Sequence, residues 1–367
     1  MFTTADHEYM TLALRLAERG LYSTTPNPRV GCVLVNHGKI IGQGAHLKAG
    51  QPHAEVIALR DAQQHYPELI KGADVYVTLE PCSHFGLTPP CANALIDAGV
   101  KRVVAAMQDP NPKVAGSGLT QLSHAGILVQ NGLMETEAQA LNAGFITRMT
   151  QNRPFVRLKI AASLDGKTAL ANGQSQWITG EAARLDVQHW RARSCAILTG
   201  SGTVIADDPQ MNVRHIQGAR QPLRVIVDSQ LRISPEAKIL VGGNTLIAYA
   251  KDSQHHADAL TDQQATLLNM PGNDGKVCLK GLLSHLATLG INEVMVEAGQ
   301  ILNGALLADE LVDELIIYYA PVLLGSDARG MLAIPTLQSM QDRVTLKLID
   351  VRQFGQDLRI IARPIRR

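Results

Sequence analysis

The chain has 367 residues, 46% of them apolar, and its 34 Lys and Arg nearly balance 33 Asp and Glu, which leaves a net charge of +1. This length predicts two domains or a little more. The balanced charge argues against nucleic acid or a membrane surface as a partner, and no stretch approaches the ~20 apolar residues that span a bilayer. The first ten residues carry no basic-then-apolar signal, so we expect a cytoplasmic protein.

The first part of the chain alternates between strand and helix patterns. Helices are expected at 6–19, 54–64 and 90–98, and strands at 30–35, 40–44, 74–79, 103–107 and 127–130. The first two strands flank a hairpin signal, N-H-G-K. A polar break with a proline, Q-N-R-P at 151–154, marks a domain boundary. We therefore predict domains at 1–148 and 149–367.

The second part repeats the α/β pattern and ends in a hairpin. Strands are expected at 155–161, 196–199, 223–227, 245–249, 293–296 and 314–319, with helices at 181–193, 282–289 and 302–308. Two final strand-like runs, 345–351 and 357–362, are joined around a glycine. They predict an antiparallel hairpin at the edge of a mostly parallel sheet.

The five cysteines divide into two groups. Such a sparse, odd set in a long chain is no disulfide framework. Cys32, Cys195 and Cys278 stand in short apolar runs, where we expect core residues of strands. Cys82 and Cys91 instead stand in a loop rich in Pro, His and Gly, where nothing calls for an apolar side chain. Cys82 and Cys91 are therefore candidates for a functional role rather than a structural one.

A zinc site is the strongest chemical signal. His53, Cys82 and Cys91 supply one imidazole and two thiolates, which leaves the fourth tetrahedral position of zinc open for water, as in catalytic sites. Glu55 stands two residues from His53, so it can lie beside the metal without binding it and act as general acid and base. The predicted starts of two helices place His53 and Cys91 where helix dipoles favour thiolate.

Longer motifs carry a family resemblance. The pattern His-x-Glu…Pro-Cys is typical of zinc-dependent cytidine and adenine deaminases, although eight residues separate the cysteines here in place of the usual two. Further motifs, in chain order, are T-P-N-P-R-V-G-C, V-T-L-E-P-C-S-H, K-I-A-A-S-L-D-G-K-T-A, S-Q-W-I-T, T-V-I-A-D-D-P and V-E-A-G. The whole chain thereby resembles the bifunctional deaminases and reductases of riboflavin biosynthesis.

The resemblance implies a fold and two consecutive reactions. The fold class is α/β, with a cytidine-deaminase-like α/β/α domain followed by a dihydrofolate-reductase-like domain built on a mostly parallel sheet. The first domain would use one Zn²⁺ to remove the 2-amino group of a diaminopyrimidinone that carries ribosylamine 5′-phosphate. The second would use NADPH to reduce the ribosyl side chain to ribityl. The partners are then small pyrimidine ribosyl phosphates, and we expect a homodimer through the reductase half.

The resemblance also implies site residues. In the first domain the pyrimidine would contact Asn27, His46 and Ala54 beside the zinc ligands, although without the resemblance a role in the Pro-flanked turn would be favoured for Asn27. In the second, NADPH would contact Ala161, Trp177, Thr203, Asp207, Ser229, Gly299, Gln300, Ile301, Leu302, Asn303, Gly304 and Ala305. The reductase substrate would contact Ser175, Arg191, Met211, Arg214 and Glu297.

Within the reductase set, roles differ. Arg191 and Arg214 suit phosphate, which guanidinium binds bidentately. Lys159 and Asp207 are the catalytic candidates at the reacting sugar, and a pairing that only orders the loop is the alternative role of both. Trp177 could be a core residue. The strand-helix junction around Gly299 lacks G-x-G-x-x-G, so a Rossmann fold is not indicated.

Two rival functions make different predictions. A deaminase acting on tRNA would carry the motif C-x-x-C and a basic surface. It would have no need for the 200 further residues that follow here. A non-enzymatic module with the same fold would have lost a zinc ligand or Glu55, and all are present. One departure from the family stands between the cysteines: Leu87 replaces a basic residue that would lie near the substrate phosphate, and His84 or a partner subunit could take over that contact.

Overall fold

The computed structural model describes residues 1–83, 90–112 and 114–365, and the chain divides into two compact units. The first unit ends at Asn152 and the second begins at Arg153. The boundary expected after residue 148 falls inside the last helix of the first unit, α6 (Ala143–Gln151). Pro154 then precedes the first strand of the second unit, β6 (Phe155–Ser163).

The first unit follows the expected order of strands and helices. Its further elements are α1 (Thr4–Glu18), β1 (Gly31–Asn36), β2 (Lys39–Ala45), α2 (Ala54–His65), β3 (Asp74–Val77), α3 (Cys91–Asp97), β4 (Arg102–Ala105), α4 (Ser117–His124), β5 (Leu128–Asn131) and α5 (Glu135–Leu141). The sheet order is β2-β1-β3-β4-β5. β1 runs antiparallel to both neighbours, whereas β3, β4 and β5 are parallel.

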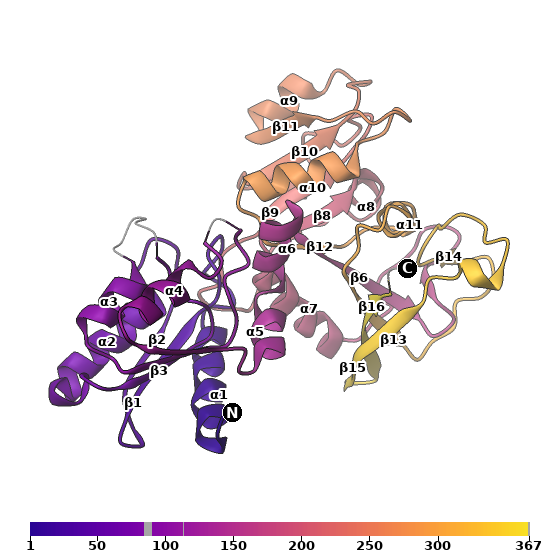
Figure 1. Ribbon diagram of the computed structural model, residues 1–367. Coiled ribbons are helices and arrows are strands. Elements are labelled where there is room, and N and C mark those ends of the chain that lie inside the picture. The colour runs from indigo at the N-terminus through magenta and orange to yellow at the C-terminus, as the bar shows by residue number, and fades with distance from the viewer. Residues whose placement is uncertain (84–89, 113, 366–367) are drawn as a thin grey trace. The chain divides into compact units, whose positions relative to one another are not determined.

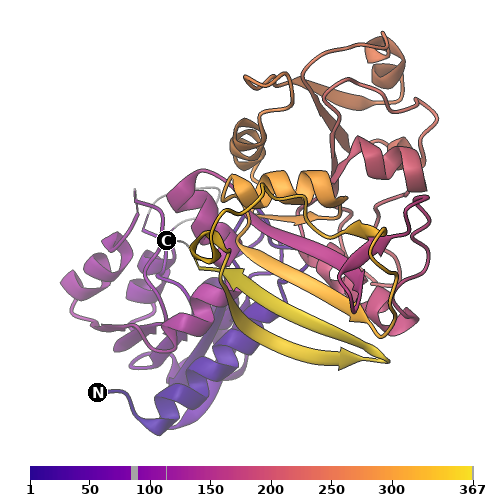
Figure 2. The same cartoon turned by 90° about the vertical axis from the view of Figure 1, so that its right-hand side faces the viewer.

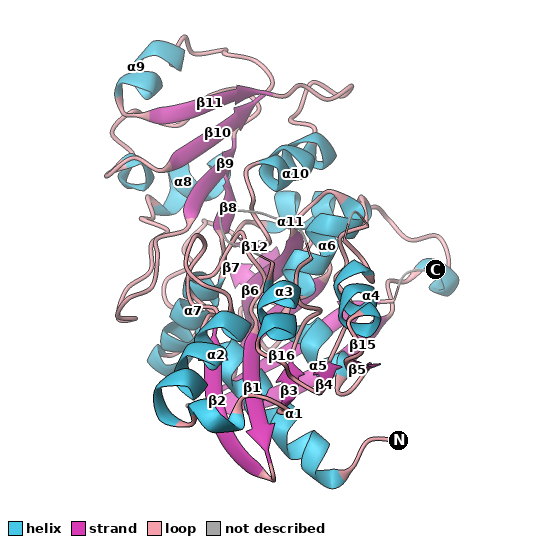
Figure 3. Ribbon diagram, turned by 60° about the vertical axis from the view of Figure 1, so that its left-hand side comes forward, coloured by secondary structure: helices cyan, strands magenta, loops and turns pink. Residues whose placement is uncertain are grey.

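Helices cover both faces of this sheet, which gives the expected α/β/α layers (Figures 1 and 3). A Cβ on Gly31 would lie 1.9 Å from the carbonyl oxygen of Ala13 in α1. One on Gly44 would lie 2.0 Å from that of Ala54 in α2. Gly44 pairs with Cys32, the neighbour of Gly31, so the two helices pack on opposite faces. Both approaches require glycine, and the second brings the start of α2 against the sheet.

The second unit is built on a nine-stranded sheet. Its further elements are β7 (Lys167–Ala169), α7 (Glu181–Arg193), β8 (Ala196–Gly200), α8 (Ser201–Asp207), β9 (Leu223–Val227), β10 (Thr245–Tyr249), α9 (Ala257–Asp262), β11 (Ala265–Asn269), α10 (Leu279–Thr288), β12 (Glu293–Val296), α11 (Gln300–Ala308), β13 (Glu314–Ala320), β14 (Arg329–Gly330), β15 (Leu346–Phe354) and β16 (Asp357–Pro364). The sheet order is β11-β10-β9-β8-β12-β6-β13-β16-β15.

The strands from β11 to β13 in this order are parallel, and the last two are antiparallel. Figure 2 shows β15 and β16 as the long pair at the yellow end of the chain. The predicted edge hairpin is therefore confirmed. A small separate ribbon pairs β7 with β14.

Two apolar layers sandwich the nine-stranded sheet. Along β12, Val294 and Val296 pack with leucines of α10 and α11, whereas Met295 packs on the other face with α7. Along β8, Ile197 packs on the face that also carries α8 and α9. The alternation follows from the period of two in a strand. Both faces of the sheet are therefore covered, as is usual for parallel sheets.

Some sequence expectations differ from the structure. Cys32 lies in β1, but Cys195 directly precedes β8, and Cys278 is the N-cap of α10 rather than a strand residue. The Cys278 sulfur accepts a hydrogen bond from the backbone N–H of Gly281 and so caps the start of α10. Helices α4, α5, α6, α8 and α9 and strands β7, β11 and β14 were not anticipated. No helix in the described part of the chain could cross a membrane.

Candidate functional site

The three predicted zinc ligands converge at the starts of two helices. His53 is the N-cap of α2, Cys91 is the first residue of α3, and Cys82 lies in the loop after β3. The Nδ1 atom of His53 lies 3.2 Å from the Sγ atom of Cys91 and 3.6 Å from that of Cys82. All three ligand atoms lie within 4.8 Å of one another.

This geometry fits zinc. Bonds of about 2.3 Å to sulfur and 2.0–2.1 Å to nitrogen place tetrahedral ligands about 3.6–3.8 Å apart. The observed separations from Nδ1 are close to these values. The hydrogen bond from the Cys91 thiol lowers the pKa of Cys82 to about 4, whereas the same bond and burial raise the pKa of Cys91. One thiolate is thus already favoured, and a bound metal favours both.

Glu55 stands beside the ligands in the first turn of α2. Its side chain is buried, and its carboxyl group contacts the Cys91 thiol. Burial, with a further contribution from the negative Cys82, raises the pKa of Glu55 to about 7. A carboxyl group with such a pKa can both accept and release a proton near neutrality. Its position therefore suits the acid and base role predicted from the sequence.

Asn27 and His46 form a second layer of the same site. The His46 ring lies edge-on to the His53 ring, with centroids 5.2 Å apart. Burial lowers the pKa of His46, so the ring is neutral near pH 7. Its Nδ1 lies 3.1 Å from the Pro52 carbonyl and its Nε2 lies 3.1 Å from Asn27 Nδ2. With a proton on Nδ1, the ring donates to Pro52 and accepts from Asn27, which leaves the Asn27 amide oxygen available.

Ala54 offers a substrate only its backbone. The side chain is fully buried against the sheet, where it belongs to the core of the first unit. As the first residue of α2, Ala54 has a backbone N–H without an intrahelical partner. Such a donor suits a carbonyl oxygen or ring nitrogen beside His53.

Glu80 is a residue that sequence reasoning missed. Its carboxylate is buried and accepts hydrogen bonds from the backbone N–H groups of Asp109 (3.0 Å), Gly116 (2.9 Å) and Gly118 (2.8 Å). A longer bond of 3.4 Å comes from Leu119. These donors belong to the loop before α4 and to its first turn. Glu80 thus fixes the segment that leads through Pro81 to the ligand Cys82.

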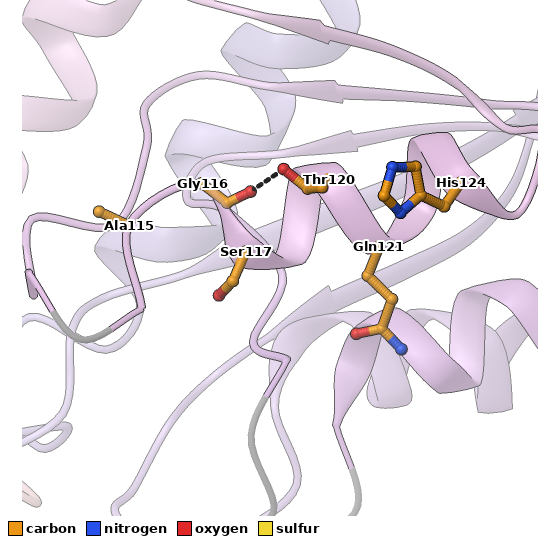
Figure 4. A pocket seen from close by; sticks show the side chains of 6 residues that line it. All are labelled: Ala115, Gly116, Ser117, Thr120, Gln121 and His124. Carbon is orange, nitrogen blue, oxygen red and sulfur yellow. Dashed lines mark hydrogen bonds between the residues drawn. The ribbon is translucent and has the colours of Figure 1, made fainter.

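A shallow groove along α4 carries none of this chemistry. Figure 4 shows its lining, Ala115, Gly116, Ser117, Thr120, Gln121 and His124. The Thr120 hydroxyl donates to the Gly116 carbonyl and the Gln121 amide to Asn93, so these polar groups serve the fold. Leu87 and His84, the residues discussed for the substrate phosphate, lie outside the described residues.

The second unit holds a cavity of about 1250 Å³ at the carboxyl ends of its parallel strands. Of the cofactor residues expected there, Ala161, Trp177, Thr203, Asp207, Ser229, Gly299, Gln300, Ile301, Leu302 and Ala305 line it. The expected substrate residues Ser175, Arg191, Met211, Arg214 and Glu297 line it too, as does Lys159. Open parallel sheets bind ligands at this end.

Asn303 and Gly304 do not line the cavity. Asn303 is buried and its amide donates to the carbonyls of Ala298 and Met331. A Cβ on Gly304 would lie 2.2 Å from the carbonyl oxygen of Ala333. Both residues therefore face the 331–333 segment on the other side of α11. Their expected cofactor contacts do not fit this arrangement.

A charged triad forms the floor of the cavity. Arg191 binds Glu297 through Nε (2.6 Å) and Nη2 (3.0 Å), and the Lys159 ammonium lies 3.8 Å from the same carboxylate. Burial alone would raise the pKa of Glu297, but the two cations outweigh it and lower that pKa to about 2. Burial lowers the pKa of Lys159. Lys159 therefore holds its proton less tightly than an exposed lysine.

This triad changes the interpretation of Arg191. Its Nη1 donates to the carbonyl of Asn212 at 3.0 Å, so both edges of the guanidinium already have protein partners. Arg214 is exposed at the cavity wall, its backbone N–H donates to Gln188, and its charge helps to lower the pKa of Glu297. Arg214 is thus the better placed of the two for a phosphate, and Arg191 orients Glu297.

The rim of the cavity carries Trp177, Asp207 and Ser175. Trp177 is 71% exposed, so it is no core residue, and its ring stacks on the guanidinium of Arg184 at 4.7 Å. Asp207, the last residue of α8, is exposed and accepts a hydrogen bond of 3.3 Å from the Ser175 hydroxyl. An exposed indole at a cavity rim is typical of a surface that stacks on a flat ring.

Fold and site together define a two-domain enzyme in which a zinc-dependent deaminase unit precedes a reductase unit. A family described as the cytidine and deoxycytidylate deaminase zinc-binding region matches residues 3–107, and one described as the RibD C-terminal domain matches residues 154–360. The riboflavin biosynthesis protein RibD of Escherichia coli is 51% identical over 96% of this chain and 98% of its own length.

Solved structures of related proteins match almost the whole chain. RibD of Acinetobacter baumannii superposes with a TM-score of 0.91 at 47% identity and covers 99% of both chains. A deaminase/reductase of Thermotoga maritima gives a TM-score of 0.88 at 32% identity, over 98% of this chain and 99% of that one. The chain belongs to the RibD family of riboflavin biosynthesis proteins. It is a bifunctional enzyme with a zinc-binding deaminase domain and an NADPH-dependent reductase domain.

Proposed function

We propose that the first unit hydrolyses the 2-amino group of 2,5-diamino-6-ribosylamino-4(3H)-pyrimidinone 5′-phosphate. The observation that carries this proposal is the cluster of His53, Cys82 and Cys91 with the buried Glu55 beside it. The Thermotoga maritima relative is described as a diaminohydroxyphosphoribosylaminopyrimidine deaminase, which supports the choice of substrate.

The deamination follows from the placement of these residues. Zinc, when bound by the three ligands, lowers the pKa of a water molecule toward neutrality. Glu55 accepts a proton from the attacking water and delivers it to the leaving nitrogen, so the C–N bond breaks and ammonia departs. Asn27 holds one edge of the pyrimidine through its amide oxygen, and the backbone N–H of Ala54 donates to the ring. His46 orients Asn27.

We propose that the second unit then reduces 5-amino-6-(5-phosphoribosylamino)uracil. NADPH, when bound, would supply a hydride for C1′ of the opened, imine-like sugar, whose imine nitrogen would need a proton. Lys159 is the proposed proton donor, because burial lowers its pKa and it lies in the cavity floor. Asp207 and Ser175 face the same cavity from its rim. Arg214 is proposed to hold the phosphate, and Arg191 to orient Glu297.

The cofactor is proposed to lie along the carboxyl ends of the strands. Ala161, Trp177, Thr203, Ser229 and the 299–302 junction line this surface, with Ala305 one turn further along α11. At the junction, backbone N–H groups of the first turn of α11 can bind the cofactor diphosphate. Trp177 offers its exposed ring to a flat group.

We further propose that two copies of the chain associate through β15. This strand lies at the edge of the sheet, and its exposed apolar side chains include Leu348 (63%), Ile349 (45%) and Val351 (50%). Such an edge invites pairing with another strand. Leu348→Lys is expected to convert a dimer to a monomer in sedimentation analysis. A parent protein that sediments as a monomer at micromolar concentration would refute this pairing.

The cytoplasm is the proposed location. All five cysteines are free, and two of them are the thiolate ligands of the zinc site. A reducing compartment keeps such thiols available.

A coupled assay tests the proposed reaction order. The chain is incubated with the diaminopyrimidinone phosphate, with and without NADPH. Without NADPH we expect one equivalent of ammonia and accumulation of the deaminated, unreduced product. With NADPH we expect the ribityl product and oxidation of one NADPH per turnover. Oxidation of NADPH with the diamino substrate in the absence of ammonia release would refute this order.

A further inference from the structure

The loop between α8 and β9 forms one wall of the cavity in the second unit. Four of its residues, Gln210, Met211, Arg214 and His215, line the cavity. From residue 209 to residue 215, all of which the structure describes, no backbone group bonds to another backbone group. Regular secondary structure therefore does not fix the position of Arg214, which is proposed above to bind the substrate phosphate.

The amide of Gln221 holds the middle of this segment. Its Oε1 accepts a hydrogen bond of 2.9 Å from the Val213 backbone N–H, and its Nε2 donates one of 3.0 Å to the Val213 carbonyl. One side chain thereby engages both polar backbone groups of one residue, as a neighbouring strand does at a hydrogen-bonded position of an antiparallel pair. Gln221 comes from the far end of the same loop, just before β9.

Two side chains of α7 hold the residues on either side of Val213. The Gln188 amide oxygen accepts from the Arg214 backbone N–H at 2.9 Å, and Arg191 Nη1 donates to the Asn212 carbonyl at 3.0 Å. Gln188 and Arg191 stand three residues apart, so they lie on one face of α7. The backbone of residues 212–214 is thus bound by side chains in place of a strand or a helix.

The backbone conformation around this segment depends on such support. Met211 has a φ of 48° and His215 a φ of 65°, values that residues other than glycine rarely adopt. Such conformations persist only where the surrounding structure fixes them. Met211 is anchored by its buried side chain, whereas Arg214 and His215 are exposed. Among the described residues, no hydrogen bond engages the Arg214 guanidinium, so its position depends on the backbone that carries it.

Gln221 differs from the two residues of α7 in its position. Gln188 and Arg191 line the cavity, so a change at either could act on a ligand directly. Gln221 does not line the cavity, and its side chain is exposed on the outer surface of the loop. An effect of Gln221 on substrate binding must therefore pass through the loop.

We propose that Gln221 is a positioning residue for the substrate of the second unit. Its amide fixes the backbone of Val213 and so holds the adjacent Arg214 where the guanidinium binds the substrate phosphate. A loop that is fixed in its binding conformation binds more tightly than one that adopts it for only part of the time. This inference rests on the role proposed for Arg214, and it gives Gln221 no part in hydride or proton transfer.

The test is steady-state kinetics of the reduction of 5-amino-6-(5-phosphoribosylamino)uracil, with NADP⁺ affinity measured by titration calorimetry. Gln221→Leu is expected to raise KM for this substrate roughly fivefold, because two hydrogen bonds between neutral groups are lost. The value of kcat and the NADP⁺ affinity are expected to stay within about twofold. Gln221→Ala, which adds no apolar surface, is expected to behave in the same way. Gln221→Asn keeps the amide on a shorter side chain, and an intermediate KM is expected.

A double-mutant cycle with Arg214 separates positioning from a general structural role. In an Arg214→Ala background, Gln221→Leu is expected to change KM by less than about twofold, because the side chain that it positions is absent. Gln217→Leu is the matched control. Gln217 is an exposed glutamine of the same loop that does not line the cavity, and its side chain makes no hydrogen bond to the described residues. This variant is expected to leave KM within about twofold of the parent.

Several outcomes would overturn the proposal. An unchanged KM in Gln221→Leu and Gln221→Ala would show that the loop keeps its place without this amide. A matching loss of NADP⁺ affinity would mean that Gln221 supports the cavity as a whole. A full effect in the Arg214→Ala background would mean that Gln221 acts through another residue. A folded parent that does not reduce this substrate would refute the proposed function itself, which differs from a failure of this inference alone.

Discussion

Glu80 is not one of the three zinc ligands, yet removing its carboxylate should destabilise the first unit of the chain. Three hydrogen bonds of 2.8–3.0 Å join it to backbone N–H groups of residues 109, 116 and 118. Each hydrogen bond to a charged group contributes roughly 1.5–3 kcal/mol. Because water can reach two of these donors, we expect Glu80→Ala to lower the free energy of unfolding by about 3–4 kcal/mol.

Glu80→Gln is the conservative variant with which the stability loss of Glu80→Ala can be compared. Glu80→Gln keeps one acceptor oxygen and loses the other, so about half of that loss is expected. For a unit of this size, 3 kcal/mol lowers the melting temperature by roughly 6–12 °C. The assay follows release of zinc to a chromogenic chelator on heating, with NADPH oxidation by the reductase unit as the control. If Glu80→Ala releases zinc within about 1 °C of the parent, Glu80 does not hold the α4 segment.

Other variants test the remaining assignments. Glu55→Gln should retain zinc and lose roughly 10²–10⁴-fold in deaminase turnover, because it removes the group that moves the proton; turnover within about threefold of the parent would show that another group does so. Asp207→Asn should slow reduction more than it weakens NADPH binding, and unchanged single-turnover hydride transfer would leave Asp207 an orienting residue. Asp6→Asn should cost about 2–3 kcal/mol at pH 7, since Asp6 accepts from Tyr76 (2.6 Å) and Arg102 (2.8 Å). Despite burial, the Arg102 bond lowers the pKa of Asp6, so this stability is present above about pH 3.8 and is lost as the pH falls below it. Denaturant unfolding at pH 7 and pH 3 should therefore show a smaller difference between parent and variant at the lower pH, and an undiminished difference would contradict this linkage.

The zinc ligands could be predicted from the sequence because their signal is local. His53 and Cys91 stand at helix starts that proline and apolar spacing already indicate, and Cys82 follows a proline after a strand. Glu80 could not be assigned in the same way. Its partners are backbone N–H groups about thirty to forty residues downstream, and no side-chain pattern marks them.

In the reductase unit, the resemblance predicted more cofactor contacts than the structure allows. It implied that the whole continuous run 299–305 contacts the cofactor. An α-helix turns once in 3.6 residues, so it cannot present seven consecutive side chains to one cavity. Asn303 and Gly304 face away for this reason.

The central claim is that one chain carries two chemically independent sites, and Cys82→Ala tests it most directly. All three zinc ligands lie in the first unit, and the entire reductase cavity lies in the second. Both activities are measured in one preparation of the variant, with the diamino substrate for the deaminase and the deaminated substrate plus NADPH for the reductase. The account predicts loss of zinc and of deamination, with reduction within about twofold of the parent. Loss of reduction in a folded Cys82→Ala protein would contradict it.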